Sequence, residues 1–174
     1  CRCKKSIKKF SNCLLLTESG FFEKNSLRKS LFENYINDVI FLCKKFKLNC
    51  VHYKLHPRSR GKWHIKFIDQ LRKNNLKIEL LDQKNFINKI ACDYPVIASA
   101  LSGSLKIARR SCNKIKVVGL INQSIPAHGN LNYRQLLDNN GIEWLEDPKK
   151  FNTSNTKKTF YKNKKRKILT DYIK

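Results

Sequence analysis

Short apolar runs alternate along this chain with longer amphipathic stretches, and this alternation constrains the fold more than any other feature. The apolar runs have strand length and lie at residues 14–17, 50–55, 76–81, 94–98 and 116–121. Helical patterns follow them at residues 32–43, 63–71, 86–90, 103–108 and 133–137. Strands that alternate with helices favour a parallel sheet covered on both faces. The sequence therefore predicts an α/β fold with a doubly wound, mostly parallel, Rossmann-like sheet.

The chain has the size of one domain. Its 174 residues are 41% apolar, which is enough for a single core. We expect a basic N-terminal segment at 1–11, a Rossmann-like nucleotide-binding domain at 12–148 and a Lys-rich C-terminal tail at 149–174. The sequence contains no methionine, so we expect it to be a piece of a longer product.

The charge is strongly positive. Lys and Arg number 37 against 13 Asp and Glu, a formal net charge of +24, which favours anionic partners such as nucleotides, nucleic acid, anionic lipid or acidic sugars. Lys outnumbers Arg and Asn is abundant, as in proteins of low-GC genomes, so part of this charge belongs to a solvated surface. No apolar run approaches the roughly 20 residues of a membrane span. We expect a cytoplasmic protein whose basic tail makes peripheral contact with the anionic lipid of the inner membrane.

The cysteines do not indicate a metal. Seven is an odd number, most of them stand inside apolar segments, and their spacing is not that of a zinc site. The pair Cys1 and Cys3 lacks a second pair that would complete a site. The sequence therefore predicts reduced, buried thiols, no metal and no cofactor.

Two stretches carry groups suited to a phosphate, and each follows a predicted strand. His56-Pro57-Arg58 ends the second strand, and Ser102-Gly103-Ser104 follows the fourth. Ligands of open α/β sheets bind outside the carboxyl ends of the strands, so we expect both loops to meet over one crevice. A glycine and hydroxyl groups at a helix start offer free donors to an anion. Simple helix capping by Ser102 is the alternative.

In order and spacing, residues 12 to about 125 resemble a known family. The segments LLLTESG, YKLHPR and PVIASALSGSLKIAR are similar to the C-terminal nucleotide-binding domain of bacterial GT-B sialyltransferases, namely the lipooligosaccharide sialyltransferase and polysialyltransferase families. Those families carry a His-Pro motif and a downstream pair of adjacent hydroxyl residues. This chain departs from the second motif, because Gly103 separates its two serines.

The resemblance implies one half of a GT-B glycosyltransferase, with CMP-sialic acid as donor and a glycan as acceptor. His56 would hydrogen-bond the CMP phosphate and act as an acid for the leaving group, since imidazole changes charge near neutral pH. Pro57 would fix the turn, Arg58 would neutralise charge, and Ser102, Gly103 and Ser104 would hold the phosphate oxygens. The family's general base comes from an acidic motif in a separate N-terminal domain. No such motif precedes residue 12, so we expect this chain alone to bind nucleotide without transferring sugar.

Two alternatives remain open from the sequence. A CDP-glycerol-type glycerophosphotransferase would use a similar His-Pro motif and later serines. A non-catalytic basic RNA-binding protein would account for the charge and for the Lys-rich segment 157–167. The aromatic residues stand at core spacing and form no RNP-like motif, so nucleic acid is not the expected partner.

Overall fold

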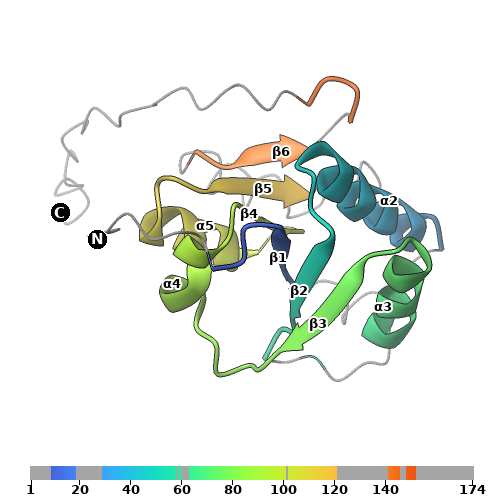
Figure 1. The fold of residues 1–174 in the computed structure, drawn as a ribbon, viewed down its shortest axis with the longest axis horizontal. Helices are drawn as coiled ribbons and strands as arrows, with labels where there is room; N and C mark the ends of the chain where they lie inside the picture. The colour runs from blue at the N-terminus through green and yellow to red at the C-terminus, as the bar shows by residue number, and fades with distance from the viewer. Residues whose placement is uncertain are drawn as a thin grey trace, which may run out of the picture.

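The fold is an α/β sandwich built on one parallel sheet (Figure 1). A computed structural model describes residues 9–18, 29–57, 59, 63–100, 102–120, 141–145 and 148–151. Within them, six strands are arranged in the order β3-β2-β1-β4-β5-β6, and all neighbouring pairs are parallel. The strands are β1 (Cys13–Thr17), β2 (Cys50–Lys54), β3 (Lys77–Leu81), β4 (Val96–Ser99), β5 (Lys116–Leu120) and β6 (Glu143–Leu145). This order is Rossmann-like and confirms the predicted fold class.

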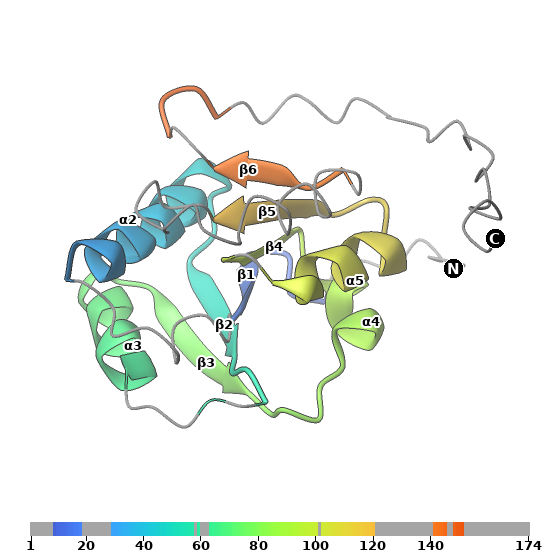
Figure 2. The same cartoon turned by 180° about the vertical axis from the view of Figure 1, so that it is seen from behind.

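Helices cover both faces of the sheet (Figures 1 and 2). The described helices are α2 (Lys29–Lys45), α3 (Trp63–Lys73), α4 (Ile87–Ile90) and α5 (Gly103–Ser111), with a 3-10 turn, η1 (Ala91–Asp93), after α4. Helices α2 and α3 pack on one face, where Leu14, Leu16, Val51 and Tyr53 are buried. Helices α4 and α5 pack on the other, around Leu15 and Ile97. Alternate residues of the strands thus enter two separate cores, which makes the central strands apolar throughout.

The β3 edge of the sheet is less covered than its centre. The five residues of β1 and of β2 are all buried, whereas those of β3 are exposed or half-buried. Between β3 and β4 the chain forms only the four-residue α4 and the η1 turn, instead of a long crossover helix. The α4/α5 face therefore leaves β3 partly open, and polar side chains of β3 can face solvent there.

Several details differ from the sequence-based expectations. A sixth strand, β6, was not expected, and it pairs with β5 from Val118 to Leu120. The strand expected at 94–98 begins at Val96, so Pro95 precedes β4, and the Pro95 carbonyl accepts a bond from the Lys116 amide at 3.0 Å. The helix expected at 133–137 lies outside the described residues, and so does nearly all of the tail. The domain boundaries remain predictions. No helix in the described part of the chain is long and apolar enough to cross a membrane.

Candidate functional site

The carboxyl end of β1 stands at the point where the strand order reverses. From β1 the chain builds β2 and β3 on one side, and then returns to place β4, β5 and β6 on the other. The loops that follow β2 and β4 therefore leave the sheet on either side of β1, at the edge where open α/β sheets bind ligands.

Glu18 ties the loop after β2 to the end of β1. Its side chain is only 2% exposed, and its amide donates to the Lys54 carbonyl at 2.9 Å. One carboxylate oxygen accepts the His56 amide at 2.6 Å, and the other accepts the Ser59 hydroxyl at 3.1 Å. A buried carboxylate needs such donors to offset its desolvation. These bonds therefore fix the backbone of the His-Pro turn against β1.

Thr17 ties the loop after β4 to the same strand end. Its hydroxyl shares a hydrogen bond of 2.6 Å with the Ser104 hydroxyl, and its carbonyl accepts the Ser99 hydroxyl at 2.6 Å. Ser99 is completely buried, so this second bond lies inside the sheet. The two loops are thus held by adjacent residues, Thr17 at the end of β1 and Glu18 directly after it.

Five of the six residues predicted for the phosphate site lie in the described part of the chain. His56 is half-buried and Pro57 is exposed, both directly beyond β2, while Arg58 lies outside the described residues. Ser102, Gly103 and Ser104 are half-buried at the start of α5. Ser102 is the N-cap of α5, because its hydroxyl accepts the Ser104 amide at 3.2 Å. The capping interpretation of Ser102 is therefore confirmed, and contact with a phosphate stays a prediction for all six.

Lys54 adds a buried cation next to this edge. Its side chain is 8% exposed, and its amine donates to the Gln83 carbonyl at 2.9 Å in the loop after β3. Burial lowers the pKa of Lys54, and the nearby Asp82 carboxylate works against that shift. Burial also raises the pKa of Tyr53 on the opposite face, with smaller contributions from Tyr35 and Glu18. The phenol of Tyr53 is therefore neutral at physiological pH.

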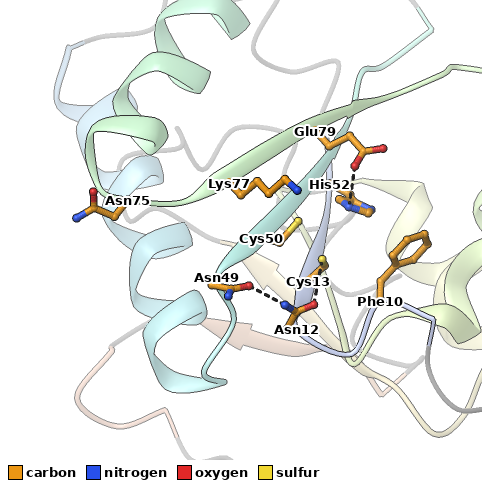
Figure 3. Close-up of a pocket in the computed structure, with 9 residues that line it drawn as sticks. All are labelled: Phe10, Asn12, Cys13, Asn49, Cys50, His52, Asn75, Lys77 and Glu79. Atoms are coloured by element: carbon orange, nitrogen blue, oxygen red, sulfur yellow. Dashed lines mark hydrogen bonds and ion pairs between the residues drawn. The ribbon is translucent and has the colours of Figure 1, made fainter.

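A pocket of about 590 Å³ lies at the other end of the same strands (Figure 3). It opens beside the amino ends of β1, β2 and β3, on the α4/α5 face, and its lining residues are Phe10, Asn12, Cys13, Asn49, Cys50, His52, Asn75, Lys77 and Glu79. The Cys13 thiol, the Cys50 thiol and a ring nitrogen of His52 all lie within 4.8 Å of one another. All three residues are buried.

His52 is held from two sides. Its Nδ1 shares a hydrogen bond of 2.7 Å with the Tyr94 hydroxyl, and its Nε2 lies 3.3 Å from a carboxylate oxygen of Glu79. Phe10 packs edge-on against the imidazole, with ring centroids 4.6 Å apart. Burial lowers the pKa of His52, Glu79 raises it, and Lys77 lowers it further. The dominant effect, burial, favours the neutral ring.

Sequence reasoning missed most of these residues. Thr17 and Glu18 hold the two edge loops, and no local sequence pattern indicates these contacts. Cys13 and Cys50 are far apart in the sequence and match no zinc motif, yet each is the first residue of its strand and the two are register partners. The sequence feature that could have indicated this contact is the position of each cysteine at the start of its strand. Residues at equivalent positions of neighbouring parallel strands are neighbours in space.

The sheet and its order define the class of this protein as a Rossmann-like α/β domain. No family model matches the chain, and no curated protein matches it. Among solved structures, it is similar to a shikimate 5-dehydrogenase from Mycobacterium fortuitum, with 11% sequence identity and a TM-score of 0.39. The match covers 76% of this chain and 43% of that one, so the chain spans less than half the length of the dehydrogenase.

Proposed function

We propose that the carboxyl edge of this sheet binds the phosphate of a cytidine nucleotide-sugar, CMP-sialic acid, as the nucleotide-binding half of a GT-B sialyltransferase. The observation that carries the proposal is the joint anchoring of the two loops. Glu18 holds the His56 turn, and the neighbouring Thr17 holds Ser104 at the start of α5. The two motifs that resemble the family therefore flank one strand end, as a shared ligand requires.

The start of α5 supplies the first part of an anion site. A nine-residue helix presents the Gly103 amide and the positive end of its dipole at this edge, while the Ser104 and Leu105 amides bond Ser102. The Ser104 hydroxyl already bonds Thr17 and Ser102, at 2.6 and 2.9 Å. A phosphate oxygen at this helix start would replace one of these bonds or accept the Gly103 amide.

His56 supplies the second part, and Glu18 limits where the phosphate can lie. A phosphate in direct contact with the Glu18 carboxylate would be repelled. Both carboxylate oxygens, however, already accept donors from the His56 loop, and the side chain is 2% exposed. The phosphate would therefore bind on the solvent side of Glu18, where the imidazole of His56 can act as donor and acid.

The experiment is calorimetric titration of CMP into the purified chain. We expect one CMP per chain, with affinity at least about 10-fold weaker in His56→Ala and in Ser104→Ala, because each variant loses about one charge-assisted or helix-start bond. The matched control for Ser104→Ala is Ser111→Ala, which removes a hydroxyl from the far end of the same helix, where it donates to the Ile107 carbonyl. That control should bind CMP like the parent chain.

The same titration separates the competing functions. Tighter binding of CDP-glycerol than of CMP-sialic acid would favour the glycerophosphotransferase alternative. Binding of RNA that falls steeply with salt and ignores His56→Ala would favour the basic RNA-binding alternative. Absence of CMP binding in a folded chain, or CMP binding that both edge variants leave unchanged, would contradict the proposed site.

A further inference from the structure

We propose that Cys13, Cys50, His52 and Glu79 form a zinc site at the amino end of the sheet, on the pocket shown in Figure 3. The site is separate from the carboxyl edge and does not depend on the proposed nucleotide. It would join the three neighbouring strands β1, β2 and β3 on the face that α4 leaves open.

The three inner ligand atoms are close to the positions that zinc requires. Tetrahedral zinc has bonds of about 2.3 Å to sulfur and about 2.0–2.1 Å to nitrogen, which puts neighbouring ligand atoms roughly 3.5–3.8 Å apart. Here the two sulfurs and the imidazole nitrogen all lie within 4.8 Å of one another. Small side-chain rotations, of about 1 Å or less at the ligand atoms, would close the set around an ion. Two thiols and an imidazole are also the donors that zinc prefers.

Glu79 can supply the fourth ligand, although the mutual 4.8 Å set comprises only Cys13, Cys50 and His52. Its carboxylate oxygen lies 3.3 Å from Nε2 of His52, close to the separation expected for an oxygen and a nitrogen bound to one zinc ion. The Glu79 side chain is 58% exposed, so it can move toward the ion without disturbing the core. Glu79 and His52 are register partners on β3 and β2, which keeps the two side chains adjacent.

We assign Nε2 of His52 as the metal-binding nitrogen, because Nδ1 is bonded by Tyr94 whereas Nε2 faces Glu79. Tyr94 bonds Nδ1 at 2.7 Å, so with Nδ1 protonated toward the phenol oxygen the lone pair of Nε2 is left for the metal. Such an outer hydrogen bond is the usual partner of a metal-bound histidine. Tyr94 is thus a positioning residue.

Charge balance also fits. Both thiols release their protons when zinc binds, so two thiolates and one carboxylate would leave the bound ion with a net charge of −1. Lys77 lines the same pocket and is the register partner of Cys50 on β3. Its ammonium group would neutralise the remaining charge.

The test uses the chain without a polyhistidine tag, under reductant, with Co²⁺ as spectroscopic probe and Zn²⁺ in competition with a chromophoric chelator. We expect one Co²⁺ per chain, with the absorption of a tetrahedral site and a thiolate-to-metal band, and displacement by Zn²⁺. Changing an outer partner of a metal ligand costs about 10–100-fold in affinity. We therefore expect a loss in that range for Tyr94→Phe, and a loss of more than about 100-fold for Cys13→Ser and Cys50→Ser.

The controls separate this site from other thiols. Cys92→Ser is the matched control, because Cys92 is half-buried, its thiol bonds the Ser111 carbonyl, and it is not among the residues that line the pocket. Cys1→Ser/Cys3→Ser removes the other pair of close cysteines. Both controls should keep the full metal spectrum. Glu79→Gln tests an exposed residue whose change leaves the core intact, and it should weaken zinc binding while preserving the thiolate band.

Two results would overturn the proposal. One is a folded, reduced chain that takes up no Co²⁺ or Zn²⁺ against the chelator. The other is a metal spectrum that survives in Cys13→Ser and Cys50→Ser or disappears in Cys1→Ser/Cys3→Ser. If the two strand variants fail to fold, Glu79→Gln and Tyr94→Phe decide, and unchanged zinc affinity in both would equally reject the site.

Discussion

Replacing Glu18 tests whether this buried carboxylate organises the carboxyl edge. In Glu18→Ala the His56 amide and the Ser59 hydroxyl both lose their acceptor. Hydrogen bonds to a charged group contribute about 1.5–3 kcal/mol each, so these two bonds together contribute about 3–6 kcal/mol. Removing the carboxylate also removes its desolvation cost, and water can reach the half-buried loop. We therefore expect Glu18→Ala to lower the free energy of unfolding by about 3 kcal/mol.

Glu18→Gln should be much milder, and the reason is geometric. The amide oxygen of glutamine can accept the His56 amide, while its NH₂ group donates to the Ser59 hydroxyl, which then acts as acceptor. Both bonds persist without the charge, so the expected loss is about 1 kcal/mol. The larger loss of stability expected for Glu18→Ala than for Glu18→Gln thus tests the hydrogen bonds of this side chain.

Urea unfolding of the parent chain and both variants measures these differences, provided that the slope with denaturant is unchanged. A double-mutant cycle between Glu18→Ala and Ser59→Ala should give a coupling of about 1 kcal/mol, because the two residues share one bond. Amide hydrogen exchange at His56 should accelerate in Glu18→Ala and less in Glu18→Gln. Equal destabilisation by the two variants, or a more stable Glu18→Ala, would refute the anchoring role of the carboxylate.

Two further predictions concern the cores on either side of the site. Burial raises the pKa of Asp38 to about 7 from 3.8, so stability should fall as the pH rises between these values and then level off. Asp38→Asn should therefore match the parent chain at about pH 4 and exceed it by about 2–4 kcal/mol at about pH 8, in thermal or urea unfolding, and an equal gain at both pH values would contradict this. A Cβ at Gly119 would overlap the indole ring of Trp144, so Gly119→Ala should cost about 1–3 kcal/mol. The loss of stability caused by Gly119→Ala should be smaller in a Trp144→Ala background. An equal loss in both backgrounds would show that the overlap with Trp144 is not its cause.

The hydrophobic pattern predicted the fold because the central strands are buried on both sides. The runs at 14–17 and 116–121 coincide closely with β1 and β5, and an amphipathic stripe marks α2. The strand β6 could not be predicted in the same way. It has three residues, two of them half-buried, and its Glu143 forms an ion pair with the buried Lys116. This short edge strand is held by the Lys116–Glu143 ion pair and by Trp144, which packs on Gly119. It has no apolar run from which a strand could be predicted.

The candidate site was predictable only where the signal was local. His56-Pro57 and Ser102-Gly103-Ser104 are short motifs, and the position of each after a strand follows from the alternation of elements. What the sequence could not provide is the pair of bonds that join the motifs through Thr17 and Glu18, since these depend on which strands become neighbours. Strand order is decided by crossover connections, and the sequence alone left that order open.

The ligands of the proposed metal site also come from different strands, so no local motif predicts them. The packing of the sheet explains why they meet. Core packing requires Leu14 and Val51 to face α2 and α3, so the residues before them, Cys13 and Cys50, must face α4 and α5. A slip of one residue between β1 and β2 would turn the side chains of one strand to the opposite core and would separate the thiols. The forces that fix the register of the two strands therefore also fix the spacing of the two sulfurs. A zinc site of this kind needs no local cysteine motif, because the parallel sheet supplies the spacing that such a motif would otherwise encode.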